Sequence, residues 1–583
     1  MNAVSPVESL VTDHLDLWTA ALKRKSTAGR GSSSKVELYG IKKLRELILE
    51  LAVRGLLVSQ DPDDEPASEL LKKIAAEKTK LIKAGKIKKD KPLPAISDEV
   101  VPFVAPHGWK WARIAEIGYD FGQKTPDADF TYIDVGAIDN RLGLIDCPAT
   151  LLAEDAPSRA RKLVSRGTVI YSTVRPYLLN VAIVQKDFDP EPIASTAFAV
   201  VHPFEGVVSG YVYRYLRSPS FVAYVESVQA GIAYPAINDR QFFSGLIPLP
   251  PTAEQHRIVA KVDELMVLCD QLEQQTDASL GAHQTLVETL LSALTSAADH
   301  AQFTSAWLRI AGHFNMLFTT EESIAQLKQT ILQLAVMGKL VAQDPNDEPA
   351  SELLKKIAAE KTKLVKEGKI KKEKSLPPIN REELPHYIPE GWAYERFGRL
   401  AIIERGGSPR PIQSFLTDQP DGLNWIKIGD TDIGGKYITT TKEKITKEGL
   451  AKTRMVYPGD FLLTNSMSFG RPYITKIEGC IHDGWLRISP AEQVDKNYLY
   501  LLLSSPYIVK SFTESAAGAV VQNLNSDKVR EVLILLPPLA EQHRIVVKVD
   551  ELMALCDQLK SRFSDAQTTQ FHLADALVEQ AIG

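Results

Sequence analysis

The sequence is poor in cysteine and has no long apolar run. Its 583 residues include only four cysteines, which are far apart and form no C-x-x-C pair, at Cys147, Cys269, Cys480 and Cys556. Neither a disulfide framework nor a cysteine zinc site is indicated. No apolar stretch approaches the length of a membrane span, and the N-terminus lacks the pattern of a secretory signal. We therefore expect a protein of the reducing cytoplasm with no membrane partner.

The sequence also lacks the motifs that bind common cofactors. It has no G-x-x-x-x-G-K-[ST] loop for ATP and no G-x-G-x-x-G after a strand for a dinucleotide. An adenine methyltransferase would carry an Asn/Asp-Pro-Pro-aromatic motif, but the Pro-Pro pairs here stand in LPPT, LPPI and LPPL. The eleven histidines are repeated or single, so no metal cluster is indicated. We expect no catalytic residue, no metal site and no cofactor in this chain.

The charge balance does not point to nucleic acid. The formal net charge is −5, and hydrophobic and charged residues make up 44% and 24% of the chain, as in an ordinary soluble protein. Residues 110–246 carry 13 basic and 15 acidic side chains, and residues 393–535 carry 18 and 16. A DNA-binding face would have to come from clustering in space. The length predicts several domains.

What the sequence does contain is a tandem repeat. The eighteen residues DEPASELLKKIAAEKTKL stand at 64–81 and again, unchanged, at 347–364. Residues 60–91 match residues 343–374 at 28 of 32 positions. After about 140 unrelated residues, the match returns in LPPTAEQHRIVAKVDELMVLCDQL from Leu249 and LPPLAEQHRIVVKVDELMALCDQL from Leu536. Each half is therefore a shared arm, a divergent middle and a shared tail.

The shared segments have the periodicity of helices. Ile41, Leu44, Ile48 and Leu51 are spaced by three and four, as are Ile324, Leu327, Ile331 and Leu334. The tails continue this pattern as a coiled-coil seam. Its positions are Ile258, Val262, Leu265, Cys269 and Leu272, and then Ile545, Val549, Leu552, Cys556 and Leu559. The first tail is expected to remain helical to about Ala298.

The divergent middles look like two globular α/β domains. Both contain β-rich runs interrupted by Gly, Pro and Asn, such as GTVIYSTVRPYLLNVAIV and PGDFLLTNSMSFGRPYITKI. The predicted segments are a helical arm (1–104), an α/β domain (105–248), a long helix (249–300), a second arm (301–387), a second α/β domain (388–535) and a last helix (536–583). We expect an α/β fold with pseudo-two-fold symmetry and long antiparallel helices. Gene duplication alone would also give a repeat, but uniform drift would not retain the arms while changing the middles.

This arrangement resembles the specificity subunits of type I restriction-modification enzymes. The segments that carry the resemblance are PLPPTAEQHRIVAKVDEL at 248–265, LLPPLAEQHRIVVKVDEL at 535–552 and the variable domain before each. The resemblance implies two target recognition domains that each bind half of a split, asymmetric DNA sequence. It also implies helices that set the spacing of the half-sites and bind methyltransferase subunits, with two expected, and it implies motor-nuclease subunits as further partners. S-adenosylmethionine, ATP and Mg would then belong to the partners.

Three pairs of loops are the candidates for contact with DNA. The first pair reaches an Arg-Pro-Tyr at 175–177 and 471–473, and arginine and asparagine form paired hydrogen bonds with guanine and adenine. The second follows Gly231 and Gly518, since glycine permits close approach to a phosphate backbone. The third, here called the lead-in loops, is FGQKTP at 121–126 and RGGSPRP at 405–411. The predicted contacts are Gln123, Lys124, Thr125, Ser172, Arg175, Tyr177, Asn180, Tyr234, Asn238, Ser408, Arg410, Lys427, Asn465, Ser466, Ser468, Arg471, Gln522, Asn523 and Asn525.

Other interpretations of these segments stay open at this stage. The Arg-Pro-Tyr loops fit ordinary hairpins, and the glycine loops fit helix-terminating turns. The basic runs KAGKIKKDK and KEGKIKKEK fit solvated turns as well as a surface that flanks DNA. For the whole chain, the alternatives are a coiled-coil scaffold with two protein-binding modules and a cryptic nuclease or methyltransferase. The missing cofactor motifs count against the enzyme.

Overall fold

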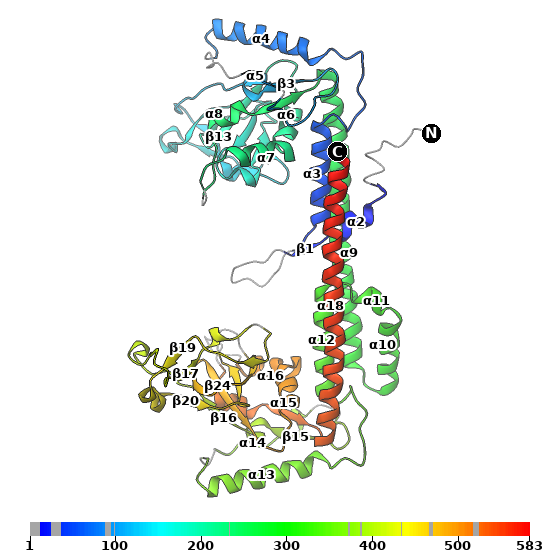
Figure 1. Ribbon diagram of the computed structural model, residues 1–583, viewed down its shortest axis with the longest axis vertical. Helices are drawn as coiled ribbons and strands as arrows, with labels where there is room; N and C mark the ends of the chain where they lie inside the picture. Colours follow the sequence, from blue (N-terminus) through cyan, green and yellow to red (C-terminus); the bar gives the residue numbers. More distant parts are fainter. Residues whose placement is uncertain are drawn as a thin grey trace. The chain divides into compact units, whose positions relative to one another are not determined.

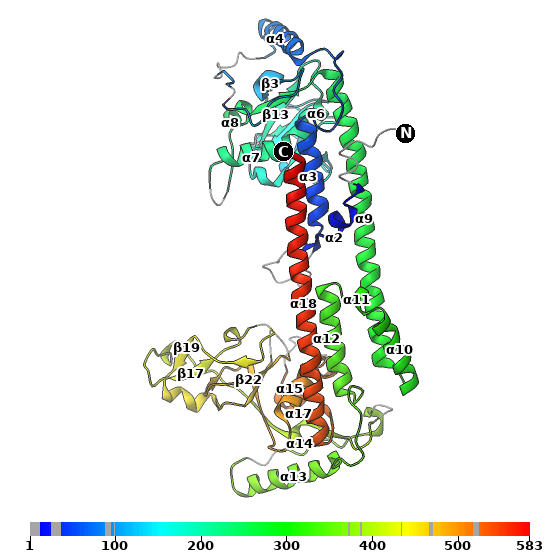
Figure 2. The same ribbon diagram turned by 45° about the vertical axis from the view of Figure 1, so that its right-hand side comes forward.

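The computed structural model describes residues 12–24, 36–87, 95–97, 99–231, 234–370, 374–384, 388–432, 434–465, 470–516 and 524–582. The chain divides into two compact units. Unit 1 consists of residues up to Leu280 together with those from Asp565 onward, and unit 2 of Gly281–Ser564. Figure 1 and Figure 2 label many of the helices and strands of the two units, which are described in turn.

The frame of unit 1 is helical. It contains α2 (Leu15–Ala20), α3 (Tyr39–Val53), α4 (Ala67–Lys83), most of α9 (Thr252–Ser296) and the end of α18 (Leu539–Ile582). Arg45 of α3 forms ion pairs with Asp270 and Glu273 of α9 at 2.7 and 2.8 Å. The Tyr39 hydroxyl donates to Asp575 of α18 at 2.8 Å. Helix α3 is therefore held between the beginning of one long helix and the end of the other.

The predicted apolar periodicity of this frame is confirmed. Ile41, Leu44, Ile48 and Leu51 of α3 are all buried in one core. The seam of α9 is buried in the same core at Ile258, Val262, Leu265 and Cys269. Helix α9 starts directly after Pro250 and Pro251 and ends at Ser296, two residues before the expected end. The two prolines lie just before the first helical residue, where a missing N–H interrupts no helical hydrogen bond.

Unit 2 repeats this frame with an addition. Its helices are α12 (Glu321–Val336), α13 (Ala350–Lys366), most of α18 and the end of α9, and α10 (His300–Gly312) and α11 (Phe314–Leu317) are extra. Lys328 of α12 pairs with Asp557 of α18, at the positions equivalent to Arg45 and Asp270. Since Glu321 pairs with Lys560 at 3.7 Å, α12 runs antiparallel to α18. Because the unit boundaries at residues 280 and 564 fall inside α9 and α18, each long helix begins in one unit and ends in the other.

Module 1 (110–249) is the α/β part of unit 1. A sheet of order β11-β10-β13-β4 lies beside one of order β8-β5-β12-β9, in which β5 and β12 are parallel. Strands β3 and β14, at the two ends of the module, pair with each other and place both ends beside the frame. The strands are β3 (Lys110–Arg113), β4 (Gly118–Tyr119), β5 (Phe130–Ile133), β6 (Ile138–Asp139), β7 (Leu144–Ile145), β8 (Ala149–Leu151), β9 (Ala160–Leu163), β10 (Val169–Ser172), β11 (Val181–Ile183), β12 (Pro192–Ser195), β13 (Phe198–Pro203) and β14 (Leu246–Leu249). The helices are α5 (Ile114–Ile117), α6 (Ser209–Leu216), α7 (Pro219–Val228) and α8 (Asp239–Ser244).

Module 2 (393–536) has a related but different sheet. Its larger sheet has the order β16-β24-β21-β22-β18, so β18 adds an edge strand parallel to β22, and its smaller sheet has the order β19-β17-β23-β20. The strands are β15 (Ala393–Arg396), β16 (Ala401–Arg405), β17 (Leu423–Ile426), β18 (Tyr437–Ile438), β19 (Glu443–Ile445), β20 (Arg454–Val456), β21 (Phe461–Thr464), β22 (Pro472–Thr475), β23 (Gly479–Ile481), β24 (Trp485–Pro490) and β25 (Leu533–Leu536). The helices are α14 (Phe397–Leu400), α15 (Lys496–Ser504), α16 (Pro506–Ala516) and α17 (Ser526–Glu531). The predicted α/β class with long helices is confirmed.

Candidate nucleic-acid interface

The repeated AEQHR segment holds each long helix to its own module. In α9, buried Glu254 accepts a hydrogen bond from the Trp109 indole at 2.9 Å, and Arg257 pairs with Asp64 at 2.6 Å. Gln255 accepts from the backbone N–H of Val208 at 2.8 Å. These bonds join α9 to the start of the eighteen-residue repeat and to the GW turn. The verbatim segments therefore have a structural role in fixing the module to the frame.

The same contacts recur in unit 2. Glu541 accepts from the Trp392 indole at 2.9 Å, and Arg544 pairs with Asp347 at 2.6 Å. Burial raises the pKa of both carboxyls, Glu254 and Glu541, above the usual glutamate range, and the tryptophan hydrogen bond opposes this rise. Two modules of different sequence are thus attached in one way, which leaves their outer loops free to differ.

In module 1 the Arg-Pro-Tyr loop meets the glycine loop. The backbone N–H of Arg175 donates to the Pro235 carbonyl at 2.8 Å, and that of Ile237 donates to Thr173 at 3.0 Å. The Arg175 guanidinium lies over the ring of Tyr234, 5.1 Å from its centroid, and Tyr234 is 69% exposed. Two candidate loops that are 60 residues apart in sequence therefore form one surface with an arginine and a tyrosine on it.

A buried lysine connects this region to the lead-in loop. Lys162 of β9 is 3% exposed and pairs with Asp120 at 2.6 Å and Asp239 at 2.9 Å. Asp120 also accepts from the N–H of Gly122 at 2.7 Å, and Asp239 begins α8 directly after Asn238. Burial would lower the pKa of Lys162, but the hydrogen bonds and charges of the two aspartates raise it, so the lysine is held charged. Lys162 was not predicted, because an isolated lysine in a strand has no recognisable pattern.

The structure separates the predicted residues of module 1 into two groups. Side chains at the surface are Gln123, Thr125, Arg175, Tyr177, Tyr234 and Asn238, and Lys124 is partly exposed and paired with Asp127 and Glu191. Ser172 and Asn180 are only 2% and 8% exposed, and the Ser172 hydroxyl donates to the Val174 carbonyl. These two side chains lie inside the hairpin, and their contact with DNA stays a prediction. Asn238 caps α8 with its side chain.

In module 2 the equivalent connection is made by Asp483. One carboxylate oxygen of Asp483 accepts from the Ser408 hydroxyl at 2.9 Å and lies 3.0 Å from Nε2 of His482, and the other lies 3.8 Å from Arg410. The Asp483 carbonyl accepts from the Asn465 amide at 2.8 Å. The lead-in loop and the Arg-Pro-Tyr hairpin are thereby joined at one residue, the first through the Asp483 carboxylate and the second through its backbone carbonyl. Neither His482 nor Asp483 was predicted, because the turn HDG resembles any surface turn.

The same residues line an open cavity of about 720 Å³. Its walls come from the lead-in loop and from Trp425, Lys427, Glu443, His482 and Asp483. Lys427 and Glu443 form an ion pair of 2.5 Å in this wall. A concave surface with charged groups of both signs offers donors and acceptors to a polar ligand such as a base edge. Lys427, Ser408 and Arg410 are therefore placed together, as candidates on one surface.

The remaining predictions for module 2 fall into three groups. Arg471 is exposed beside the hairpin, and its backbone N–H donates to the Thr464 hydroxyl at 2.9 Å. Asn465 is only 1% exposed and the Asn525 side chain caps α17, and the contact of both residues with DNA stays a prediction. Ser466, Ser468, Gln522 and Asn523 lie outside the described residues.

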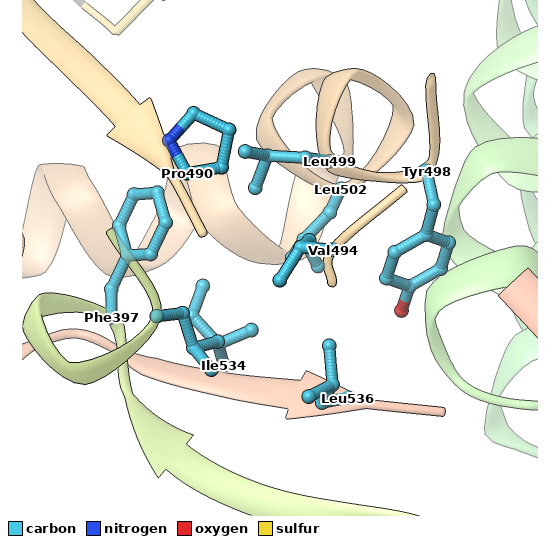
Figure 3. A pocket seen from close by; sticks show the side chains of 9 residues that line it. Phe397, Pro490, Val494, Tyr498, Leu499, Leu502, Ile534 and Leu536 are labelled. Carbon is cyan, nitrogen blue, oxygen red and sulfur yellow. The ribbon is translucent and has the colours of Figure 1, made fainter. Parts of the chain in front are cut away.

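A second pocket of unit 2 belongs to its apolar core. Figure 3 shows a small apolar pocket lined by nine residues from α14, β25 and the segment around α15, including Phe397, Val494, Leu502 and Ile534. Its one polar group, the Tyr498 hydroxyl, donates to the Leu535 carbonyl at 3.1 Å. Such a lining suits packing between helix and sheet. Within the described ranges, no cluster of metal-binding side chains and no helix able to span a membrane is found.

Two divergent modules on a repeated helical frame define a modular binding protein, and its class follows from its similarity to known proteins. The family model for the type I restriction modification DNA specificity domain matches residues 389–565. The chain is 41% identical over 596 aligned residues to the EcoEI specificity subunit of Escherichia coli, covering 99% of this chain and 100% of the relative. It is equally identical, over 607 aligned residues, to the EcoAI specificity subunit of Escherichia coli, with the same shares covered.

The chain belongs to the family of specificity subunits of type I restriction enzymes. A solved structure, from work on complex assembly and conformational transition of the type I R-M system, matches with a TM-score of 0.50 at 24% identity. The match covers 82% of this chain and 99% of the chain in the solved structure, and it supports the fold of the two modules and their helices. The resemblance drawn from the repeated tails is confirmed.

Proposed function

We propose that this specificity subunit recognises a split, asymmetric DNA sequence, with one half-site bound by each module. The recognition domains would be residues 105–248 and 388–535. The observation that carries the proposal is that each unit attaches its module by the same bonds, Trp109–Glu254 and Trp392–Glu541, while the outer loops differ in residues and in length. A constant attachment with variable loops is what two half-sites of different sequence require.

The recognition surfaces would be the joined loops. In module 1 these are the loops around Arg175, Tyr234 and Gln123, and in module 2 those around Arg471, Arg410 and Lys427. Arginine and lysine donate to guanine O6 and N7, and a carboxylate such as Glu443 accepts from cytosine N4. The phosphate backbone would be contacted by Lys124 and by backbone N–H groups, which position the modules without contributing sequence information.

We further propose that the chain is not catalytic and acts in the cytoplasm within a larger complex. Its partners would be double-stranded DNA, two methyltransferase subunits and the motor-nuclease subunits, with no membrane component. S-adenosylmethionine, ATP and Mg would bind to the partners, since no cofactor is assigned to this chain. The helical frame would bind the methyltransferases and set the spacing of the half-sites.

The test is a map of methylated positions in the genome of a host that carries this system. A split site with two different half-sites supports the proposal. A continuous palindrome contradicts it. Replacement of residues 388–535 by the corresponding module of another family member should then change one half-site only, and a change in both halves would contradict independent recognition.

A further inference from the structure

The eighteen-residue repeat contains more identity than its packing requires. Eight of its positions are exposed in both copies and still identical, among them the lysines at 72, 73 and 80 and their equivalents at 355, 356 and 363. The buried positions Leu70 and Ile74 fix the helix to the module and explain their own identity. They do not explain the identity of the outer face.

The neighbouring helix pair gives an internal comparison. Helices α3 and α12 agree at the buried pair Leu44 and Leu327, but they differ at the exposed pair Lys42 and Ala325 and at buried Leu47, which is replaced by a threonine in α12. This helix pair has therefore diverged on both its buried and its exposed sides. The outer faces of α4 and α13 have not diverged, which indicates that both faces contact the same kind of ligand.

The composition of the shared face favours a phosphate ligand over a protein. Helices α4 and α13 each carry five lysines and two glutamates, a net charge of +3 per helix. The exposed identical positions are lysine, alanine, threonine, glutamate and proline, with no aromatic, methionine or arginine. The centres of protein interfaces are enriched in aromatic residues, methionine and arginine and depleted in lysine and alanine. A lysine-rich face without large apolar groups is typical of phosphate contact.

The position of each helix within its unit fits this ligand. The Lys78 ammonium donates to the Ala115 carbonyl of α5 at 2.8 Å, and its equivalent Lys361 donates to the Gly398 carbonyl of α14 at 2.6 Å. Helix α5 continues through β4 into the lead-in loop of module 1, and α14 continues through β16 into that of module 2. Each lysine-rich helix, seen beside α5 or α14 in Figure 1, is thus bonded to the element that carries a candidate DNA loop.

The lysines are not locked in strong bonds. Lys72 and Lys73 pair with Glu69 and Glu65 at 2.7 Å, and Lys355 and Lys356 make the same pairs in unit 2. All four pairs lie at the surface, where an ion pair contributes ~0–1 kcal/mol. A phosphate can therefore replace these carboxylates at little cost.

We propose that the exposed faces of α4 and α13 bind the phosphate backbone of DNA outside the bases that the modules recognise. The proposal rests on the proposed function, in which the chain binds duplex DNA. It accounts for the contrast within the repeat: bases differ between the half-sites, so the modules diverge, whereas phosphates are the same at both, so the helices stay identical. The contact adds affinity and salt dependence without sequence preference.

The test compares charge-matched variants of the full chain. One triple variant carries Lys72→Gln, Lys73→Gln and Lys80→Gln, and a second carries Lys355→Gln, Lys356→Gln and Lys363→Gln. The control carries Lys42→Gln, Lys548→Gln and Lys560→Gln, which lie on exposed faces of α3 and α18 and remove the same charge. Glutamine and lysine have similar helix propensities, so circular dichroism melting should give the same stability for all variants.

Binding to a random-sequence duplex and to the mapped target is measured by fluorescence anisotropy over a range of salt concentrations. Each lysine–phosphate contact contributes ~0.9 to the slope of log K against log salt, so each triple variant should lower the slope by ~2–3. The ratio of the affinities for the two duplexes should not change, and the control should keep the wild-type slope. A wild-type slope in both triple variants overturns the proposal.

Two further outcomes separate the alternatives. Unchanged DNA binding together with lost methylation in the assembled enzyme would assign the face to a protein partner and overturn phosphate binding. If the wild-type chain bound no duplex, alone or with its methyltransferase subunits, the proposed function itself would fail. Lost methylation with unchanged DNA binding would contradict only the role of α4 and α13. Absence of duplex binding by the wild-type chain would contradict the proposed function, and it needs no variant to be observed.

Discussion

At the scale of the residue, Arg175 and the ring of Tyr234 form an exposed cation–π pair on the joined loops of module 1. Arg175→Ala should reduce discrimination at one base pair of the corresponding half-site by ~1–3 kcal/mol, because the paired hydrogen bonds of a guanidinium to guanine are lost. Arg175→Lys should keep more of the affinity but lose similar discrimination, since an ammonium lacks the planar fork.

Methylation of a substrate library with single base changes measures this discrimination. Arg166→Ala is the matched control, because Arg166 is an exposed arginine of the same module whose carboxylate contact, Asp187, is 3.9 Å away. Wild-type discrimination in Arg175→Ala would assign the Arg-Pro-Tyr loop a structural role. Arg471→Ala tests module 2 in the same way.

Loss of the buried Lys162 side chain should lower the stability of module 1. Lys162→Ala leaves Asp120 and Asp239 without their shared cation, so module 1 should lose ~1–3 kcal/mol in unfolding free energy. Both aspartates retain some contact with water, which keeps the cost in this range. Urea unfolding measures the loss, with the exposed Lys186→Ala as control. Binding to the half-site of module 2 should not change, and an equal loss at both half-sites would contradict a local role.

At the scale of the element, the attachment of α9 and α18 should depend on pH. Burial raises the pKa of Glu254 and Glu541, so the folded protein binds protons more readily than the unfolded chain. Stability is then higher at low pH and decreases as the pH rises from the ordinary glutamate pKa through the raised one. Glu254→Gln with Glu541→Gln should remove this part of the decrease, because an amide oxygen still accepts from the tryptophan.

Thermal melting between mildly acidic and mildly basic pH checks this expectation. The exposed pair Glu264→Gln and Glu551→Gln is the control, since these side chains are 59% and 56% exposed and lie on the same helices. Parallel pH profiles for the wild type and the buried-site variant would show that the two carboxyls do not titrate in this range.

The helices of the frame were predictable because one face of each is apolar with a period of 3.6 residues, as at Ile41, Leu44 and Ile48. The two hairpins were predictable from alternating strands around a polar turn. The roles of Lys162 and Asp483 were not predictable, because each residue joins segments that are distant in sequence. The burial of Asn465 was not predictable either, since a polar residue at a strand end reads equally as a surface residue or as a loop support.

At the scale of the whole molecule, the proposed spacing role of the long helices can be tested by their length. One heptad inserted after Leu272 keeps the apolar seam in register and adds roughly 10 Å of helix. At ~3.4 Å per base pair, the preferred gap between the half-sites should grow by about two to three base pairs, with both half-sites unchanged. Methylation of a plasmid library with all gap lengths measures this.

An insertion of only two residues is the control for the heptad. It moves the apolar positions off the seam, so it should reduce binding of the methyltransferase subunits. An unchanged gap in a folded, active heptad variant would mean that the long helices do not measure the distance between the half-sites.

Unit 1 is completed by the last residues of the chain, and this affects the order of biosynthesis. Ala574 is fully buried in the core of α3 and α9, and Tyr39 bonds to Asp575. A ribosome that adds ~5–20 residues per second needs roughly 15–60 s between Leu280 and the C-terminus. Throughout that interval the apolar side of α3 and α9 lacks its third helix. The nascent N-terminal half therefore remains an incomplete core that chaperones can bind, and a stop codon shortly before Asp565 would leave it so permanently.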